Sequence, residues 1–279
     1  MWVGQQLADG LDFWGFLGSL ILGGIILGIY TGLLGYVGAK TGLSLDLLSQ
    51  RAFGEKGSYL PSAMTSFTQI GWFGVGSFVS GGTATPNFAR FAKNGKSGAI
   101  TTVVAFFIGN SLMFFFGAVS SIFVGGNDIF EVMIRLNLFY LAVLVLGLNI
   151  WTTNDNALYT AGLGLANIFH QRKKPMVLLS GIIGTVASVW LYYNFCGWLN
   201  ILNCTLPPVG MILVLAYFMN KEDFETDQPK LKTIDWFAVA GVILGAIVAN
   251  LLHWGIASIN GMVVAAVCYC VGQAVNKRK

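Results

Sequence analysis

Charged residues are scarce in this chain. Of its 279 residues, 16 are Lys or Arg and 12 are Asp or Glu, a charged share of 10%, whereas soluble domains carry about 25%. Hydrophobic residues make up 55% of the chain. This composition excludes a disordered chain, a coiled coil and a cytosolic globular domain. It predicts an all-α protein that crosses a membrane several times, because each spanning helix needs about 20 mostly apolar residues.

Cysteine is also rare, and no motif for catalysis or transition-metal binding is found. The four cysteines lie in or beside apolar runs, which predicts small buried hydrophobic residues rather than a disulfide framework: Cys196, Cys204, Cys268 and Cys270. The chain contains no HExxH, GxSxG or P-loop sequence and no Cys/His metal spacing. Because no nucleophile is paired with a base, we do not expect an enzyme.

Long apolar runs dominate what is present. We expect one transmembrane domain over residues 1–279, with eight membrane segments: 11–36, 59–84, 98–124, 138–169, 176–195, 198–219, 236–252 and 254–275. The last two segments are separated so briefly that we expect a tight helical hairpin. In the first segment Gly24, Gly28 and Gly32 are four residues apart, a spacing that lets membrane helices pack closely.

Basic residues cluster in the loops between these segments. Their distribution predicts a cytoplasmic C-terminus, and it suits cytoplasmic loops better than a nucleic-acid-binding face. The segment 59–84 breaks the alternation, since basic loops flank it on both sides. Its 26 residues are too few to cross twice. Either an odd number of crossings has become one near Gly76, or the protein tolerates a basic external loop.

The segment 138–169 has a polar middle: Asn149, Thr152, Thr153, Asn154, Asp155 and Asn156. Polar groups inside a membrane helix usually face a cavity, a partner or an ion path. Helical geometry places Asn149, Thr152, Thr153 and Asn156 on one face. Hydroxyls and a free backbone carbonyl there are hard oxygen ligands that suit Na⁺, while Asn154 lies roughly 140° away around the helix and faces another neighbour, such as a substrate. The alternative is that these groups only hydrogen-bond neighbouring helices.

A second candidate site lies in the segment 59–84. Gln69 and Trp72 are three residues apart and share a helix face, so an indole could stack on a planar heterocycle while an amide reads its edge. The alternative is an ordinary packed tryptophan. The glycine-rich stretch that follows, with Phe78 and Ser80, favours a broken helix of the kind that lines transporter sites.

Several strings resemble the bacterial cytosine permeases of the nucleobase:cation symporter-1 family. They are GIYTGLLGYVGAKTGLS (residues 28–44), TQIGWFGVG (68–76), LGLNIWTTNDNALY (146–159), SFVSGGTATPNFARF (77–91) and LPPVG (206–210). The resemblance implies a leucine-transporter-type fold with two inverted five-helix repeats and two further helices. It also implies Na⁺-coupled uptake of cytosine by alternating access across the bacterial cytoplasmic membrane, without a cofactor.

The family pattern also implies roles for individual residues. Trp72 would stack on the base and Gln69 would hydrogen-bond it. Phe78 and Ser80 would line its other side, and Asn154 would be a further contact. The Na⁺ ligands would be the carbonyl of Asn149 and the hydroxyls of Thr152 and Thr153.

The sequence departs from this family in two places. The first helix of the family would precede Met1, and a block of about two to three helices would lie between Gly76 and Ser77. We therefore expect a partial fold of about eight membrane segments, with a fusion at the join. One continuous helix there could not place both Trp72 and Phe78 around a base. The family's first helix would also supply Na⁺ ligands, so without it we expect weak or no coupled transport. The alternative function is a truncated, non-transporting membrane protein or a partner of an intact permease.

Overall fold

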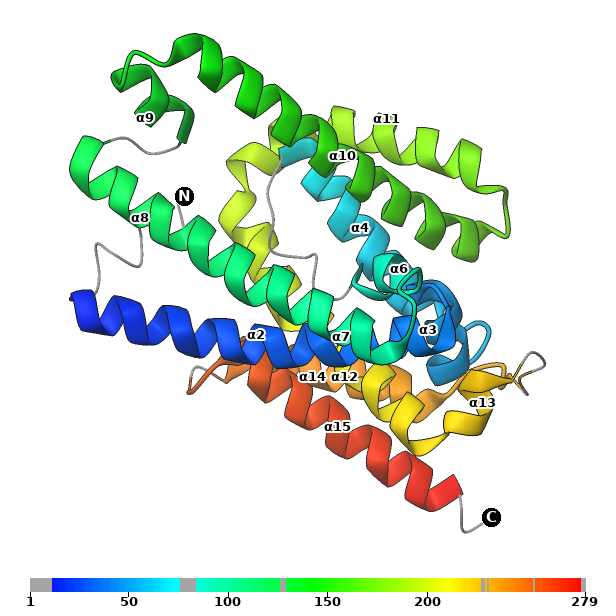
Figure 1. The fold of residues 1–279 in the computed structure, drawn as a ribbon. Coiled ribbons are helices and arrows are strands. Elements are labelled where there is room, and N and C mark those ends of the chain that lie inside the picture. The colour runs from blue at the N-terminus through cyan, green and yellow to red at the C-terminus, as the bar shows by residue number, and fades with distance from the viewer. Residues whose placement is uncertain are drawn as a thin grey trace.

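The computed structural model describes residues 12–75, 84–125, 129–226, 229, 231–252 and 254–276, and it contains helices and no strands over these residues (Figure 1). The helices are α2 (Phe13–Thr41), α3 (Leu45–Phe53), α4 (Tyr59–Val75), α6 (Pro86–Ala89), α7 (Gly95–Val104), η1 (Ala105–Gly109), α8 (Asn110–Val124), α9 (Ile129–Arg135), α10 (Phe139–Phe169), α11 (Lys173–Tyr193), α12 (Phe195–Met219), α13 (Lys221–Glu225), α14 (Trp236–Leu251) and α15 (Ala257–Asn276).

Each of the eight predicted apolar segments overlaps one of the longer helices or, for 98–124, the continuous run of α7, η1 and α8. Wherever both ends are described, the helix ends agree with the predicted ends to within five residues. Short helices in the connections were not predicted, namely α3, α6, α9 and α13. Position 84, the predicted end of the second segment, lies beyond α4, which is described only as far as Val75.

Among the described residues, five helices are long and apolar enough to cross a membrane: Phe13–Thr41, Gly95–Val124, Lys173–Leu191, Gly197–Met219 and Ala257–Val275. The helix α14 is apolar but shorter. The helix α10 has 31 residues, which is length enough, but its polar middle lowers its hydropathy. The chain is therefore an all-α, multi-pass membrane protein, and crossing by all eight segments stays a prediction.

Local sequence sets several helix ends. Asp12 accepts a hydrogen bond from the Gly15 N–H (3.1 Å) at the start of α2, and Asn94 accepts one from the Ser97 N–H (2.8 Å) at the start of α7. Such side-chain caps satisfy amides that have no partner within the helix. The helix α2 ends at Gly42, whose φ of 69° is a left-handed conformation that glycine adopts without strain.

The glycine stripe of α2 packs against the run of α7 and η1. A Cβ added at Gly32 would lie 2.6 Å from Cγ2 of Val103, and one at Gly24 would lie 2.9 Å from Cδ2 of Phe107. Only glycine allows the two helices to approach this closely. The prediction that this spacing serves helix packing is confirmed, and Figure 1 shows α7 lying against α2, whereas α8 runs away from α2 at an angle.

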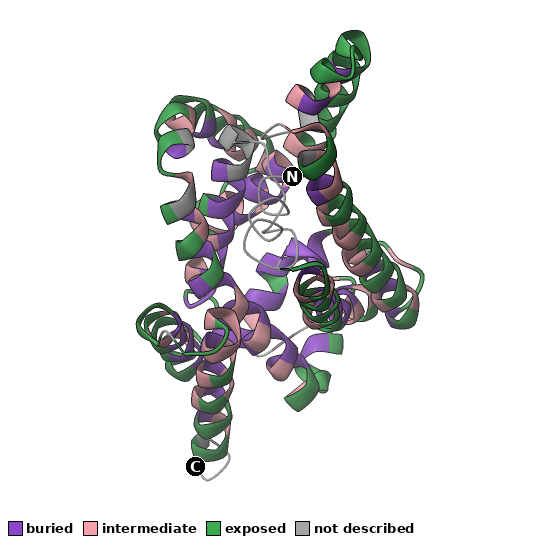
Figure 2. Cartoon of the chain, turned by 90° about the vertical axis from the view of Figure 1, so that its left-hand side faces the viewer, coloured by how far each residue is buried: buried purple, intermediate pink, exposed green. Residues whose placement is uncertain are grey.

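The core surrounds α12. Its buried side chains pack with those of α2, α3, α14 and α15, and Trp198 and Tyr217 are among the largest that are fully buried. Figure 2 shows burial concentrated where the helices meet and exposed residues on the outer faces. Cys204 is buried as predicted and Cys268 is half-buried, but the same prediction is wrong for Cys270, which is exposed.

Two groups of helices matter for the site. The helices α4, α10 and α11 pack together on one side, while α2, α6 and α7 pack together on the other. The helix pair α14 and α15 is in extensive contact, as the predicted hairpin requires. A cavity lies between the first two groups.

Candidate binding cavity

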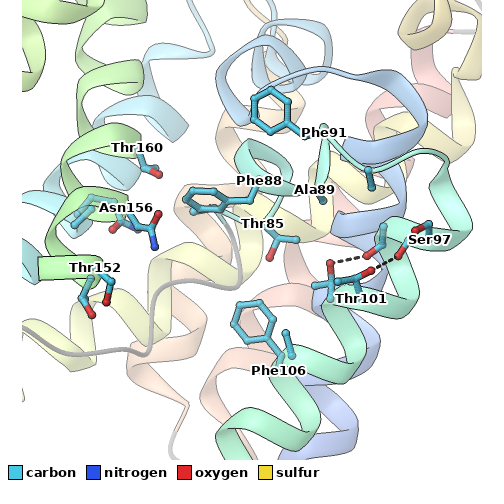
Figure 3. A pocket seen from close by; sticks show the side chains of 18 of the residues that line it. Thr85, Phe88, Ala89, Phe91, Ser97, Thr101, Phe106, Thr152, Asn156 and Thr160 are labelled. Atoms are coloured by element: carbon cyan, nitrogen blue, oxygen red, sulfur yellow. Dashed lines mark hydrogen bonds between the residues drawn. The ribbon is translucent and has the colours of Figure 1, made fainter. Parts of the chain in front are cut away.

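A cavity of about 970 Å³ lies between the two groups of helices. The helix α10 forms one wall, and α6, α7 and η1 form the other, as the close-up in Figure 3 shows. Known small-molecule sites occupy roughly 300–1,000 Å³, so this cavity is at the upper end of the range. A planar single-ring molecule would fill only part of it.

The α10 wall is polar. Asn149, Thr152, Thr153 and Asn156 all line the cavity, as their spacing along one helix face predicts. Thr160 extends the same face by one further turn. Its side-chain oxygen is buried and has no hydrogen-bond partner among the described residues.

Hydrogen bonds fix the threonine at the centre of this wall. The hydroxyl of Thr152 contacts two carbonyl oxygens of the preceding turn, that of Leu148 (3.0 Å) and that of Asn149 (3.1 Å). Because a hydroxyl donates one hydrogen and keeps two lone pairs, its oxygen can still accept a cation or a ligand hydrogen. The carbonyl of Asn149 already accepts from the Thr152 hydroxyl and lies inside α10, so a cation would have to share it with these donors.

The opposite wall was not identified from the sequence. Thr85 and Phe88 of the α6 region, Thr101 of α7 and Phe106 of η1 line it, and Phe88 points toward Asn156 across the cavity (Figure 3). The π-helical turn η1 interrupts an otherwise α-helical run, and such turns are frequent at functional sites. Two signals could have found this wall: the adjacent threonines 101 and 102 inside an apolar helix, and Pro86 at a helix start.

The predicted site residues are only partly brought together. Gln69 of α4 lines the same cavity as the α10 face and is 7% exposed. Trp72 lies in α4, but its side chain is outside the described part, and Phe78 and Ser80 lie outside the described residues altogether. Asn154 is not one of the residues that line the cavity, and its side-chain oxygen is buried without a partner in the described chain.

The charge of the cavity is low. Lys93 is the one charged side chain among the described residues that line it. No group of three or more His, Cys, Asp or Glu side chains in the described chain could hold a metal ion. The cavity therefore suits a hydrogen-bonding molecule of low charge, and any cation in it would depend on neutral oxygen atoms.

Comparison with known proteins agrees with this chemistry. The family described as "Permease for cytosine/purines, uracil, thiamine, allantoin" matches residues 1–83 and 75–275. The chain belongs to this family. A curated relative named cytosine permease, from Escherichia coli K12, is 36% identical over 372 aligned positions, which cover 100% of this permease and 88% of the relative.

Two further relatives show how far the similarity extends. The cytosine permease of Escherichia coli O157:H7 matches with the same identity and coverage. The allantoin permease of Bacillus subtilis is 34% identical over 82 residues, which cover 29% of this permease and 16% of the relative.

The alignment also bears on the join at Gly76. It extends over 372 positions, at least 93 more than the 279 residues of this permease, so a large block of the relative has no counterpart here. The family match divides into two pieces that meet at residues 75–83. Both findings agree with an internal block missing near Gly76, where the charge alternation fails.

Proposed function

We propose that this permease carries a nucleobase, cytosine, across the bacterial cytoplasmic membrane together with Na⁺, by alternating access and with its C-terminus in the cytoplasm. The observation that carries the proposal is the cavity in which Gln69 and the polar face of α10 lie together. The relatives named cytosine permease support the choice of base. The lining, uncharged apart from Lys93 among the described residues, suits cytosine, which is uncharged at neutral pH.

The base would be recognised through its edge and its faces. The amide of Gln69 offers both an acceptor and donors, which complements the mixed donors and acceptors of a pyrimidine edge. Aromatic side chains stack well on planar rings, and we assign this role to Trp72. Phe78, Ser80 and Asn154 remain further base contacts predicted from the family pattern.

The cation would bind at the α10 wall. The carbonyl of Asn149 and the hydroxyls of Thr152 and Thr153 would supply oxygen ligands of the kind that hard cations prefer. None of these ligands carries a charge, so the affinity for Na⁺ would depend on how many oxygens surround it. This makes cation binding sensitive to the loss of any one hydroxyl.

A second candidate is a membrane protein of this family that does not transport on its own. The observation that favours it is the block of at least 93 aligned positions without a counterpart here, the difference between 372 positions and 279 residues. A block of that size would remove packing partners and further ligands. Such a chain could still associate with an intact permease.

Uptake of labelled cytosine into cells without their own permease tests the two candidates. Transport by this chain predicts uptake that falls when Na⁺ is replaced by K⁺, and that falls at least tenfold in Thr153→Val. The matched control is Thr185→Val on α11, where the hydroxyl hydrogen-bonds the Gly181 carbonyl (2.8 Å) and is not among the cavity-lining residues. No uptake despite normal membrane expression, with co-purification of an intact permease, would favour the second candidate. A reporter fused to the C-terminus tests its side of the membrane.

A further inference from the structure

The helix α3 bridges the two walls of the cavity. On one side the Leu45 N–H at its start donates a hydrogen bond to Oδ1 of Asn87 (2.8 Å). Asn87 is fully buried and belongs to α6, which carries Phe88 into the cavity. A displacement of α3 would therefore also shift α6 and the cavity wall that Phe88 forms.

On its other side α3 is tied to α4 and α10. The hydroxyl of Ser62 on α4 donates to Oδ1 of Asp46 (2.6 Å). The amide of Asn167 on α10 donates to Ser62 Oγ (2.9 Å), and it accepts a hydrogen bond from Gln50 Nε2 of α3 (2.6 Å). Through Asn167 the chain of hydrogen bonds reaches the helix that forms the polar wall.

Asp46 is the titratable member of this network. Its side chain is 6% exposed, and burial raises its pKa from 3.8 to about 6, although the Ser62 hydroxyl, its own backbone N–H and the charge of Arg90 each lower it. A buried carboxylate with few donors is costly, whereas a neutral carboxyl is tolerated. The folded site therefore shifts Asp46 toward its protonated form, which predominates only below about pH 6.

Arg90, at the end of α6, is the charged group that acts on Asp46. Its guanidinium also donates to the hydroxyl of Tyr159 on α10. Three other titratable side chains near α3 have partners of their own: Tyr59 with His170, Glu225 with Tyr217, and Asp235 with Lys232.

We propose that Asp46 is a positioning residue which, when protonated, holds the two cavity walls together through α3, and which releases its proton to water when the walls separate. Separation would hydrate the carboxyl and restore its ordinary acidity. By linkage, acid favours the held arrangement and alkali the separated one. The role of Asp46 in transport rests on the proposed function, because alternating access requires the two cavity walls to move relative to each other.

Distance measurements between spin labels test the proposal without any substrate. The labels are placed at Lys96→Cys, near the α7 wall, and at Gln171→Cys, beyond the end of α10, in a chain whose four native cysteines are replaced by serine. Both labelled positions are exposed. Double electron–electron resonance in lipid nanodiscs then gives the distance distribution between pH 5 and pH 8.

The wild-type chain should show a short-distance population at pH 5 that declines as the pH rises through about 6, by up to about tenfold per pH unit. Asp46→Asn, which is always neutral, should keep the short distance at every pH. Asp235→Asn, at another buried aspartate (5% exposed), should retain the wild-type pH response. A wild-type distribution independent of pH, or a pH response that survives in Asp46→Asn, would overturn the proposal. Because no cytosine is added, absence of uptake leaves this result intact.

Discussion

Gly38→Ala should displace α6 and thereby one wall of the cavity. Gly38 lies on α2 where the backbone of Pro86 crosses it, and an added Cβ would lie 2.7 Å from Cα and 3.2 Å from the carbonyl oxygen of Pro86. Carbon atoms in contact are normally about 3.5–4.0 Å apart. The two backbones would therefore have to separate by roughly 1 Å.

Two opposing effects set the size of the change. Alanine in a helix interior is favoured over glycine by about 1 kcal/mol, while forcing an extra group into a packed contact costs about 1–3 kcal/mol. The atoms met at Gly38 belong to a proline backbone and cannot rotate away, so we expect the cost of the steric contact to exceed the gain in helix propensity. The net destabilisation is up to about 2 kcal/mol, which corresponds to a fall in Tm of up to about 8 °C.

Gly18→Ala on the same helix is the matched control, since nothing lies within 4 Å of its added Cβ. It should raise the Tm slightly through helix propensity alone. Thermal unfolding of both variants in detergent, followed by circular dichroism, compares them directly. If Gly38→Ala were as stable as Gly18→Ala, the close approach of α2 and α6 would be wrong.

Three further changes test the structure at other points. Thr160→Val should raise stability by about 1 kcal/mol in thermal unfolding, because it removes a buried hydroxyl that has no partner among the described residues. A loss of stability would mean that the hydroxyl does have a hydrogen-bond partner. Asp235→Ala should cost about 1 kcal/mol by removing the cap of the Ala238 N–H, while Asp235→Asn should keep most of it. Finally, the pKa of Asp46 is about 6 in the folded chain against an ordinary 3.8. The Asp46 carboxyl thus binds its proton more tightly in the folded state than in the unfolded state. Its contribution to the free energy of unfolding is complete below pH 4 and is lost as the pH rises through 6. The change is about 3 kcal/mol, and it should be absent from pH scans of Asp46→Asn.

The helices and one face of the site could be predicted from the sequence. Continuous apolar runs defined the long helices because backbone groups in a membrane must pair within the segment. The 3.6-residue period alone placed Asn149, Thr152, Thr153 and Asn156 on one side of α10. The glycine spacing of α2 predicted a close helix contact in the same way, because the periodicity of a single helix is enough to place these glycines on one face.

Other features needed contacts between distant parts of the chain. Nothing in the string around Phe88 indicates that it would face Asn156, 68 residues later in the chain, because that pairing depends on how α6 and α10 pack. Nothing in the sequence around Asp46 indicates that it is buried in a hydrogen-bond network, because its partner Ser62 and the Asn167 beyond it lie on other helices. Sequence fixes what is periodic within a helix. Which helices meet, and hence which polar groups lose contact with water, is decided only when all of them pack together.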